Sequence, residues 1–447
     1  MEIRDPIHGS IELSDAESLV LDSRVYQRLR QIKQLGFAEF SFPGATHNRF
    51  LHSIGAAHIA GLAFESIFKE SKSKDEPKTH SFSNPQARAR LKQALRLAAL
   101  LHDVGHGPLS HTTEEVMPEL KTLKLEAYKK RRKDVKYPAS LDDPNRQANH
   151  EDYTIKFITD SSLTKVLQDS FSDIKPIHIA CLVDKTLECP DDFFMDKGVD
   201  FRSILSQLVS SEMDCDRLDY LERDAYFCGT NYGKVELNWI LQNLTYHQID
   251  KEMYLALNRR ALYAFDDFLI SRHHMNLMVY FHHKSIIYEE MLNRYFISKD
   301  CTFFLPGDIE EYTQCSDYAL YEHLAKQKNE WAQRITNRHA FKMLFELHST
   351  ADSKRPLAMQ KELEGEGIPV IFASSAVRLS KYHGGSSVEK NFPIYVVDHY
   401  DKQSEPYPIE KSTKIFQKYD EIRRIDRLYV PPELHKKAEK IMISRKL

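Results

Sequence analysis

Several features that would define a compartment or a partner are scarce in this chain of 447 residues. The six cysteines are scattered and form no CxxC pair, which argues against a zinc knuckle or a disulfide scaffold and favours a reducing cytoplasm. No apolar run approaches the roughly 18–20 residues of a membrane span, and no apolar leader follows the first residues, so we expect a cytoplasmic protein with no membrane partner. The formal net charge is only −3, so a polyanion could be attracted only by a local basic patch.

The composition is otherwise that of a globular protein, with 42% hydrophobic and 28% charged residues. A single core rarely grows to this length, so we expect one large domain over residues 1–345 and a smaller appendage over residues 346–447. Histidine is the abundant residue type, with 21 copies. Whether these histidines are ligands depends on where they fall along the chain.

Helical periodicity dominates the chain before the tail. A turn and a short strand are expected over residues 5–13, followed by helices at Val25–Leu35, His52–Phe68 and Ala87–Leu101, and by further helices from Asp152 to about Leu347. The tail predicts strands at 370–372, 394–397 and 427–430, with a helix at 412–419. The expected fold is therefore mainly α, a helical bundle with a small α+β C-terminal region.

The segment Pro118–Gln147 is polar and contains the basic run Lys129–Lys133. A solvated loop is the ordinary interpretation of such a run. A contact with phosphate or nucleic acid is the alternative that stays open.

Histidine and acidic residues gather at four places in the helical region: His52, the doublet His102-Asp103, the pair His150-Glu151, and the acidic run Asp214–Tyr220. A divalent metal bound by imidazole and carboxylate needs ligands delivered by separate rigid helices, with positions left open for water and substrate. Helices of a bundle can provide this by pointing side chains inward.

The doublet His102-Asp103 is the sharpest of these signals. It follows the apolar run Leu95–Leu101, so it lies at the buried end of a helix, where charge is costly unless it binds something. Two glycines and a proline follow between Val104 and His111, which end the helix and let the backbone approach a ligand closely.

The order His52, His102-Asp103, Asp216 resembles the H…HD…D signature of the HD phosphohydrolases. Longer segments resemble the HD-domain dNTP triphosphohydrolases, in particular the HD core of their mammalian SAM-and-HD-domain members; these segments are Asp5–Leu13, Gln27–Arg30, Ile32–Gly36, Phe42–Phe50, His102–His111 and Asp214–Asp224. The resemblance is strong over residues 1–111 and 150–284, and no SAM domain is expected before this core.

The resemblance implies a metal centre and a catalytic set. One divalent ion, whether iron, manganese, zinc, nickel or magnesium, would be ligated by His52, His102, Asp103 and Asp216, with Asp214 as a supporting residue. The residues beside the triphosphate would be His106, His111, His150 and Glu151. One of these histidines would protonate the leaving oxygen or orient the attacking water.

The resemblance also implies a substrate site for a dNTP, cleaved to deoxynucleoside and inorganic triphosphate. Its residues would be Arg49 and Arg217 on the phosphates, Tyr220 and Asp224 on the sugar, Gln34 and Leu35 against the deoxyribose, and, after a one-residue shift, Arg272 and Tyr280 on phosphate and sugar. Leu35 and Tyr280 would then close the space of a ribose 2′-hydroxyl.

Regulation follows from the same resemblance. Asp22, Gln27 and Arg30 match residues that read an activating GTP or dGTP between subunits, although the lysine of that site aligns with Met1. We also expect a homo-oligomer, a dimer or tetramer, built through the tail. Two alternatives stay open: an HD phosphohydrolase acting on another nucleotide or on single-stranded nucleic acid, and a nucleotide- or nucleic-acid-binding protein with an HD shell.

Overall fold

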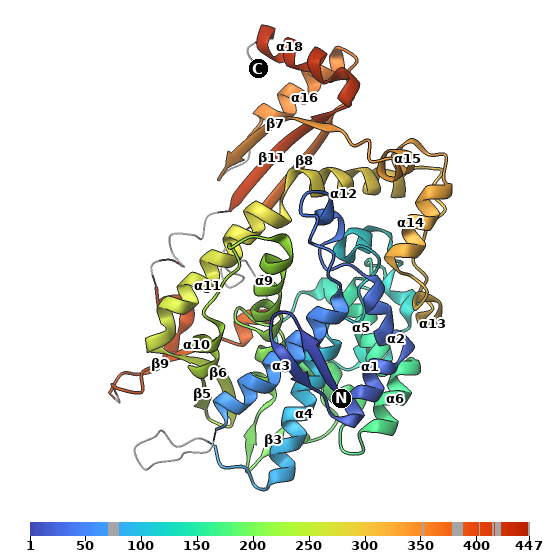
Figure 1. Ribbon diagram of the computed structural model, residues 1–447. Helices are drawn as coiled ribbons and strands as arrows, with labels where there is room; N and C mark the ends of the chain where they lie inside the picture. The colour runs from blue at the N-terminus through green and yellow to red at the C-terminus, as the bar shows by residue number, and fades with distance from the viewer. Residues whose placement is uncertain are drawn as a thin grey trace.

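The structure is a computed structural model that describes residues 1–69, 80–350, 353–377, 388–401, 403–413, 415 and 422–445. Helices make up most of the described chain. A large helical body carries a small lobe at one end, and the last helix of the chain lies at the tip of that lobe (Figure 1). The expected fold class, mainly α with a small α+β C-terminal region, is confirmed.

Three long helices form the centre of the body: α3 (Arg49–Ile67), α4 (Pro85–Leu101) and α9 (Cys215–Cys228). Each begins after a residue whose side chain accepts a backbone N–H of the first turn, namely Asn48, Asn84 and Asp214. α3 packs against both α4 and α9, and most of its residues are buried. The centre of the body is therefore built around α3.

The apolar character of α3 corrects one sequence expectation. Among the described residues, α3 is long and apolar enough to cross a membrane by length and composition alone, although no such run was expected. Yet 72% of its most apolar window is buried inside the protein, which is the pattern of a core helix.

Other helices surround these three and pack into the main hydrophobic core or into a second hydrophobic cluster. In the first part of the chain they are α1 (Asp15–Asp22), α2 (Arg24–Gln27), α5 (His150–Thr159), α6 (Ser162–Ser170), α7 (Pro176–Val183), α8 (Arg202–Val209) and α10 (Leu237–Gln242). Further along the chain they are α11 (Leu262–Met275), α12 (His283–Phe296), α13 (Ile309–Tyr312), α14 (Asp317–Lys326) and α15 (Glu330–Thr336).

The described residues form three small sheets. In the first sheet, β1 (Glu2–Asp5) pairs with β2 (Gly9–Glu12). The second, which we call the body sheet, has the order β10-β9-β6-β4-β3, with β5 also paired to β6. Its strands are β3 (Met195–Asp196), β4 (Val199–Asp200), β5 (Leu244–Ile249), β6 (Glu252–Asn258), β9 (Tyr395–Val397) and β10 (Tyr407–Pro408). The lobe sheet has the antiparallel order β7-β11-β8, with strands β7 (Lys342–Ser349), β8 (Ile371–Val377) and β11 (Arg423–Val430), and it packs against α16 (Arg355–Gly365) and α18 (His435–Arg445).

The C-terminal chain contributes to both parts of the molecule. Between β8 and β11 it returns to the body, where β9 runs parallel to β6. The buried Gln207 of α8 donates to the carbonyls of Phe392 and Pro393, both at 3.0 Å. The expected boundary at residue 345 falls inside β7, and the two-domain division stays a prediction.

Two local expectations are wrong. The helix expected over Val25–Leu35 ends with the 3-10 turn η1 (Arg28–Gln31), because Lys33 instead pairs with Asn48 in a β-bridge. The expected helical run up to Leu347 is interrupted by the β5–β6 hairpin and ends in β7. The tail strands are confirmed, whereas most of the helix expected at 412–419 lies outside the described residues.

Candidate metal centre and catalytic site

The residues predicted to ligate a metal meet where three helices end or begin. His52 lies in the first turn of α3, His102 and Asp103 at the end of α4, and Asp216 in the first turn of α9. Nε2 of His52 is 3.0 Å from Oδ1 of Asp216 and 3.5 Å from Oδ2 of Asp103. Nε2 of His102 is 3.6 Å from the same Asp216 oxygen and 3.3 Å from Oδ1 of Asp103. We call these four residues the metal group.

The two imidazoles of the metal group present the nitrogen that a metal needs. Nδ1 of His52 bonds to Oδ2 of Asp219 and Nδ1 of His102 to the carbonyl of Ala99, both at 2.8 Å. A proton on each Nδ1 leaves a lone pair on Nε2. Neither buried Nε2 has a hydrogen-bond partner among the described residues. An ion between these nitrogens and the two carboxylates would satisfy both, so the residues fit a divalent metal.

The charges around the metal group favour a cation. Burial alone would lower the pKa of His52, but Asp216 and Asp219 raise it to about 10. Burial would raise the pKa of Asp216, but His102 and His52 hold it well below its ordinary value. Because metal ligation requires deprotonated imidazoles, an ion would replace the protons that these carboxylates now attract.

Asp219 orients His52 through a buried network. Its carboxylate accepts two hydrogen bonds of 2.8 Å from Arg223, and its Oδ1 lies 2.6 Å from Nε2 of His8. Arg223 in turn donates to Asp5 at 2.8 Å. Such outer partners fix the tautomer and direction of a ligand. The sequence gives Asp219 no role beyond the acidic run, but its spacing of three from Asp216 puts both on one side of α9.

Gly55 allows α3 to approach this network. A Cβ atom at Gly55 would collide with Oδ1 of Asp219 and with the guanidinium of Arg223. Any larger residue at this position would therefore displace the pair that orients His52.

A second cluster of histidines lies beside the metal group. The rings of His106 and His150 stack with centroids 3.8 Å apart and 12° between their planes. His111 meets these rings edge-on, at 4.8 Å from His106 and 5.0 Å from His150. Nε2 of His106 is 3.4 Å from Oδ1 of Asp103, which connects the two clusters. Three of the four residues predicted as catalytic thus gather next to the metal group.

Glu114 joins two of these histidines and is a residue that the sequence reasoning missed. Its Oε1 lies 2.5 Å from Nδ1 of His150 and 2.9 Å from Nδ1 of His111. The fourth predicted residue, Glu151, is exposed on the first turn of α5. The available signal for Glu114 was its spacing of three from His111 in a turn. We call His106, His111, His150 and Glu114 the relay group.

The relay group has distinct protonation preferences. Burial would raise the pKa of Glu114, but His111 and His150 lower it to about 2. Burial would lower the pKa of His150, but Glu114 and Glu151 raise it. Burial and the charge of Arg49 hold the pKa of His106 well below its ordinary value. His150 therefore carries a proton more readily than His106.

The geometry of the relay group suits proton transfer better than metal binding. Its ligand atoms lie within 4.8 Å of one another, as those of His52, His102 and Asp216 do. A metal lies near the plane of each imidazole that binds it, however, and the stacked rings of His106 and His150 share no such point. Glu114 also occupies Nδ1 of both His111 and His150.

The three arginines predicted to hold phosphates are buried. Each pairs with a carboxylate: Arg49 with Asp103, Arg217 with Asp214, and Arg272 with Glu212. These pairs fix the direction of the guanidinium groups. Asp214 caps α9 and pairs with Arg217, and its supporting role at the metal stays a prediction.

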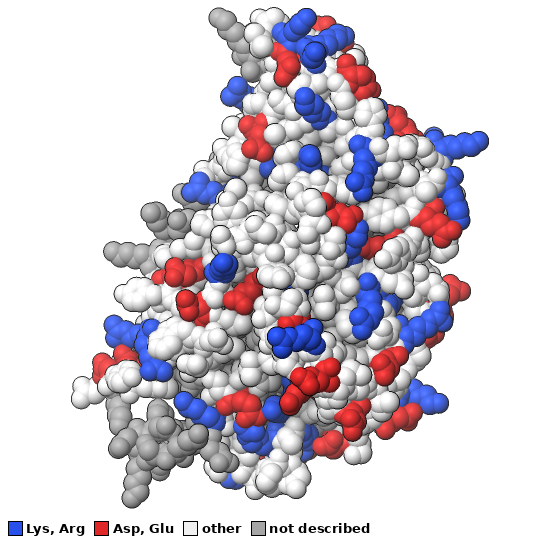
Figure 2. All heavy atoms as spheres, viewed as in Figure 1, with Lys and Arg blue, Asp and Glu red and all other residues white. Residues whose placement is uncertain are grey.

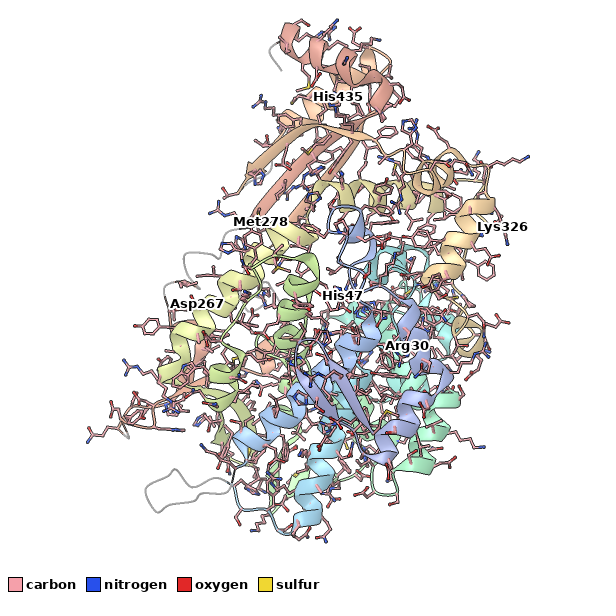
Figure 3. The ribbon with its side chains drawn as sticks, viewed as in Figure 1. Arg30, His47, Asp267, Met278, Lys326 and His435 are labelled. Atoms are coloured by element: carbon pink, nitrogen blue, oxygen red, sulfur yellow. The ribbon has the colours of Figure 1, made fainter. Side chains whose placement is uncertain are left out.

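The residues predicted to contact the sugar extend from the metal group along α9. The ring of Tyr220 lies 6.4 Å from that of His52 and 6.3 Å from that of Tyr280. The hydroxyl of Tyr280 donates to Oδ2 of Asp224 at 2.8 Å, and Oδ1 lies 2.8 Å from Nε2 of His47. Figure 3 shows His47 in the middle of the body, and its role as a partner of Asp224 was not predicted.

Gln34 and Leu35 follow η1 and lie next to this row. The backbone N–H of Gln34 donates to the carbonyl of His47 at 3.0 Å, and Leu35 packs on the main core. Tyr280 ends the π-helical turn η8 (Asn276–Tyr280) after α11.

The three residues predicted to read a guanine nucleotide form a separate surface group, with Asp22 and Arg30 exposed. Gln27 donates to the carbonyl of Leu21 and accepts from Nε of Arg30, both at 2.8 Å. The guanidinium of Arg30 lies 3.5 Å from the centre of the Phe50 ring, and Figure 3 shows Arg30 at the side of the body.

The basic run Lys129–Lys133 is tied into the fold by ion pairs. Arg131 pairs with Asp142 at 2.7 Å and with Asp184 at 3.1 Å, and Arg132 pairs with Asp134 at 2.5 Å. On the face drawn in Figure 2, basic and acidic side chains alternate without a continuous basic patch. The two arginines therefore serve the fold, and both interpretations of the run stay open for its lysines.

Known proteins share this fold and these segments. The model of the HD domain matches residues 49–153, and the model of the HD associated region matches residues 238–365. A hypothetical protein from Aquifex aeolicus has a solved structure with a TM-score of 0.71 and 26% identity, and 99% of each chain is covered.

Two curated relatives extend these matches. An uncharacterized protein of Methanocaldococcus jannaschii is 28% identical over 342 residues, which cover 76% of this chain and 59% of the relative. The deoxynucleoside triphosphate triphosphohydrolase SAMHD1 of Homo sapiens is 26% identical over 387 residues, which cover 79% of this chain and 56% of the relative. The chain thus spans less than two thirds of the length of both.

The fold and the metal group define a helical protein of the H…HD…D class. It carries an HD domain over residues 49–153 and an HD associated region over residues 238–365, which relates it to the HD-domain phosphohydrolases.

Proposed function

We propose that the protein hydrolyses a deoxynucleoside triphosphate to the deoxynucleoside and inorganic triphosphate. The main observation behind the proposal is that one carboxylate lies next to both the metal group and the relay group. Oδ1 of Asp103 lies 3.3 Å from Nε2 of His102 and 3.4 Å from Nε2 of His106. A metal-bound phosphate and a proton-carrying imidazole would therefore be close neighbours. The similarity to SAMHD1, described as a deoxynucleoside triphosphate triphosphohydrolase, supports this substrate class.

Each cluster has a part in this reaction. A bound divalent metal would supply an activated water and polarise a phosphoryl oxygen. The three paired arginines would neutralise charge on the triphosphate as the α-phosphorus–oxygen bond breaks. His111 or His150, oriented by Glu114, would give its proton to the 5′-oxygen that leaves with the deoxynucleoside.

The sugar would be selected by shape and by one carboxylate. Leu35 and Tyr280 would close the space of a 2′-hydroxyl, and Asp224, fixed by Tyr280 and His47, would accept a sugar hydroxyl. Alanine at Leu35 should then raise the rate on a ribonucleotide relative to its deoxy form. An unchanged ratio of the two rates would point to the alternative, an HD phosphohydrolase with another substrate.

A guanine nucleotide would act as an activator at Asp22, Gln27 and Arg30. Gln27 bonds to Arg30 and to the carbonyl of Leu21, the neighbour of Asp22, and Arg30 also contacts the ring of Phe50. Equal rates of dNTP turnover with and without GTP would refute this part of the proposal.

The test is a product analysis. The purified protein is incubated with manganese and each dNTP or NTP, with and without GTP, and the products are separated by chromatography. We expect deoxynucleoside plus intact triphosphate, with no turnover by His102→Ala and normal turnover by His348→Ala, which changes an exposed histidine of the lobe. Release of pyrophosphate, or turnover of other phosphoesters but of no dNTP, would contradict the proposal.

A further inference from the structure

Residues 104–111 connect the metal ligands to His111, and we call them the histidine loop. They rest on residues 312–317 of the HD associated region, which we call the anchor segment. The carboxylate of Asp317 accepts the backbone N–H of Leu109 at 2.7 Å through Oδ1 and that of Lys33 at 2.9 Å through Oδ2. The anchor segment thus binds the backbone at Lys33 and at Leu109, whose neighbour Ser110 contacts Arg49.

The histidine loop needs such support because part of it is strained. Leu109 and Ser110 have φ angles of 54° and 61°, in the left-handed region that side chains other than glycine rarely adopt. In this conformation the Ser110 hydroxyl accepts a bond of 2.8 Å from Nε of Arg49 and donates to the carbonyl of Lys33 at 2.7 Å. The strained turn therefore sets the direction of Arg49 and the starting point of His111.

Two further contacts join the same segments. The hydroxyl of Tyr312 donates to the carbonyl of Gly105 at 2.9 Å. The buried guanidinium of Arg28 donates to the carbonyls of Val104 at 2.7 Å and Cys315 at 3.1 Å. The anchor segment is thus connected to both ends of the histidine loop.

The carboxylate of Asp317 is not needed to begin its own helix. Ser316 caps α14, with its hydroxyl accepting the N–H of Ala319 at 3.5 Å. Both oxygens of Asp317 instead bind backbone outside α14, although the residue is only 3% exposed. A buried carboxylate is costly unless its bonds hold something in place.

We propose that Asp317 is a positioning residue, which holds Leu109 and Ser110 in their left-handed conformation and thereby sets Arg49 and His111 against the substrate. The HD associated region would then complete the site without contacting substrate. The inference rests on the proposed function for the roles of Arg49 and His111 and for its readout by turnover.

The test compares two isosteric changes in the manganese-loaded full chain. In Asp317→Asn the amide group faces one of the two backbone N–H donors, so one bond is lost. The control is Asp308→Asn, because Asp308 also accepts two backbone N–H groups, those of Glu310 and Glu311 at 3.0 Å, but is exposed. The readouts are hydrogen–deuterium exchange of peptides covering residues 104–111, kcat and KM, and bound manganese.

We expect faster exchange of the histidine loop in Asp317→Asn alone. Its kcat should fall by about 10- to 100-fold, as a small misplacement of reacting groups can cause, with KM changed less than about threefold and manganese content unchanged. Unchanged exchange and kcat, or equal losses in the control, would overturn the inference. If Asp317→Asn does not fold, Tyr312→Phe removes one anchor bond and should speed exchange of the same loop, and unchanged exchange there would also overturn it.

The two proposals can fail separately. If the wild type turns over no dNTP, kcat is measured on bis(p-nitrophenyl) phosphate, and faster exchange with lower kcat in Asp317→Asn would still support positioning. If dNTP turnover is intact in the wild type and equal in Asp317→Asn, the proposed function stands and the positioning role is lost.

Discussion

The metal group and the relay group are neighbours made of the same residue types, yet they differ in what holds each imidazole. In the metal group, Nδ1 of His52 and Nδ1 of His102 each have an acceptor of their own, and both Nε2 atoms face the carboxylates. In the relay group, Nδ1 of His111 and Nδ1 of His150 share one acceptor, Oε1 of Glu114.

This difference teaches that the hydrogen-bond partner of Nδ1 decides whether a histidine is suited to bind a metal or to transfer a proton. A separate acceptor holds one proton on Nδ1 of each ring of the metal group and turns Nε2 towards the carboxylates, where a metal ion would replace a second proton. A shared, ionised carboxylate instead stabilises a proton on His150 and suits acid–base chemistry. The comparison can be broken or sharpened by changing one group at a time.

The largest effect should come from removing one imidazole from each group. His102→Ala takes away a ligand, so we expect no measurable turnover at any pH. His111→Ala leaves the ligands in place, so turnover should fall by about 10²- to 10⁴-fold but stay measurable. Steady-state kinetics measures the turnover of both variants. Complete loss of turnover in both would contradict the different roles given to the metal group and the relay group.

A smaller loss, in stability, is expected at Gly55. Gly55→Ala would force a Cβ against Asp219 and Arg223 and should lower the free energy of unfolding by about 3 kcal/mol. Gly61→Ala in the same helix is the control, because its Cβ meets chiefly the side-chain end of Arg96. Urea denaturation compares the two, and equal midpoints would contradict the role given to Gly55.

Next in size is the outer partner of the metal group. Asp219→Asn keeps the shape but weakens the hold on His52, so metal affinity should fall by about 10- to 100-fold. Asp267→Asn, at an exposed residue of α11 that belongs to neither group, should leave the affinity unchanged. Competition with a chelating dye measures both, and a wild-type affinity in Asp219→Asn would show that the network is only structural.

The smallest change should appear in the pH profile of the relay group. Glu114 raises the pKa of His150 against the effect of burial, so Glu114→Gln should lower that pKa. The protonated form of His150 is lost as pH rises through its pKa, so the alkaline limb of kcat should move to lower pH. The exposed neighbour Glu115 offers the control Glu115→Gln, whose profile should match the wild type.

Much of the site could be predicted from the sequence because its residues lie in short, recognisable segments. The doublet at the end of α4 and the acidic run at the start of α9 mark helix ends, where a buried charge needs a ligand. Glu114 and Asp219 were missed because their roles depend on contacts with helices that lie far away in the sequence.

The fold was predictable to a similar degree. α3 and α4 follow from their apolar periodicity, although both begin two or three residues earlier than expected. The β5–β6 hairpin was missed because its alternation lies within a long helical stretch. The place of β9 could not be read from the sequence, since pairing with β6 is a tertiary contact across more than a hundred residues. Asp317 was likewise invisible, because nothing near it in the chain indicates the loop that it holds.

The assignment of one ion to the metal group and none to the relay group is tested most directly by counting bound metal. Wild type, His102→Ala and His150→Ala are dialysed against manganese, and the bound ion per chain is measured by mass spectrometry. We predict one ion in the wild type, none in His102→Ala and one in His150→Ala. Two ions in the wild type, with one of them lost in His150→Ala, would contradict the account.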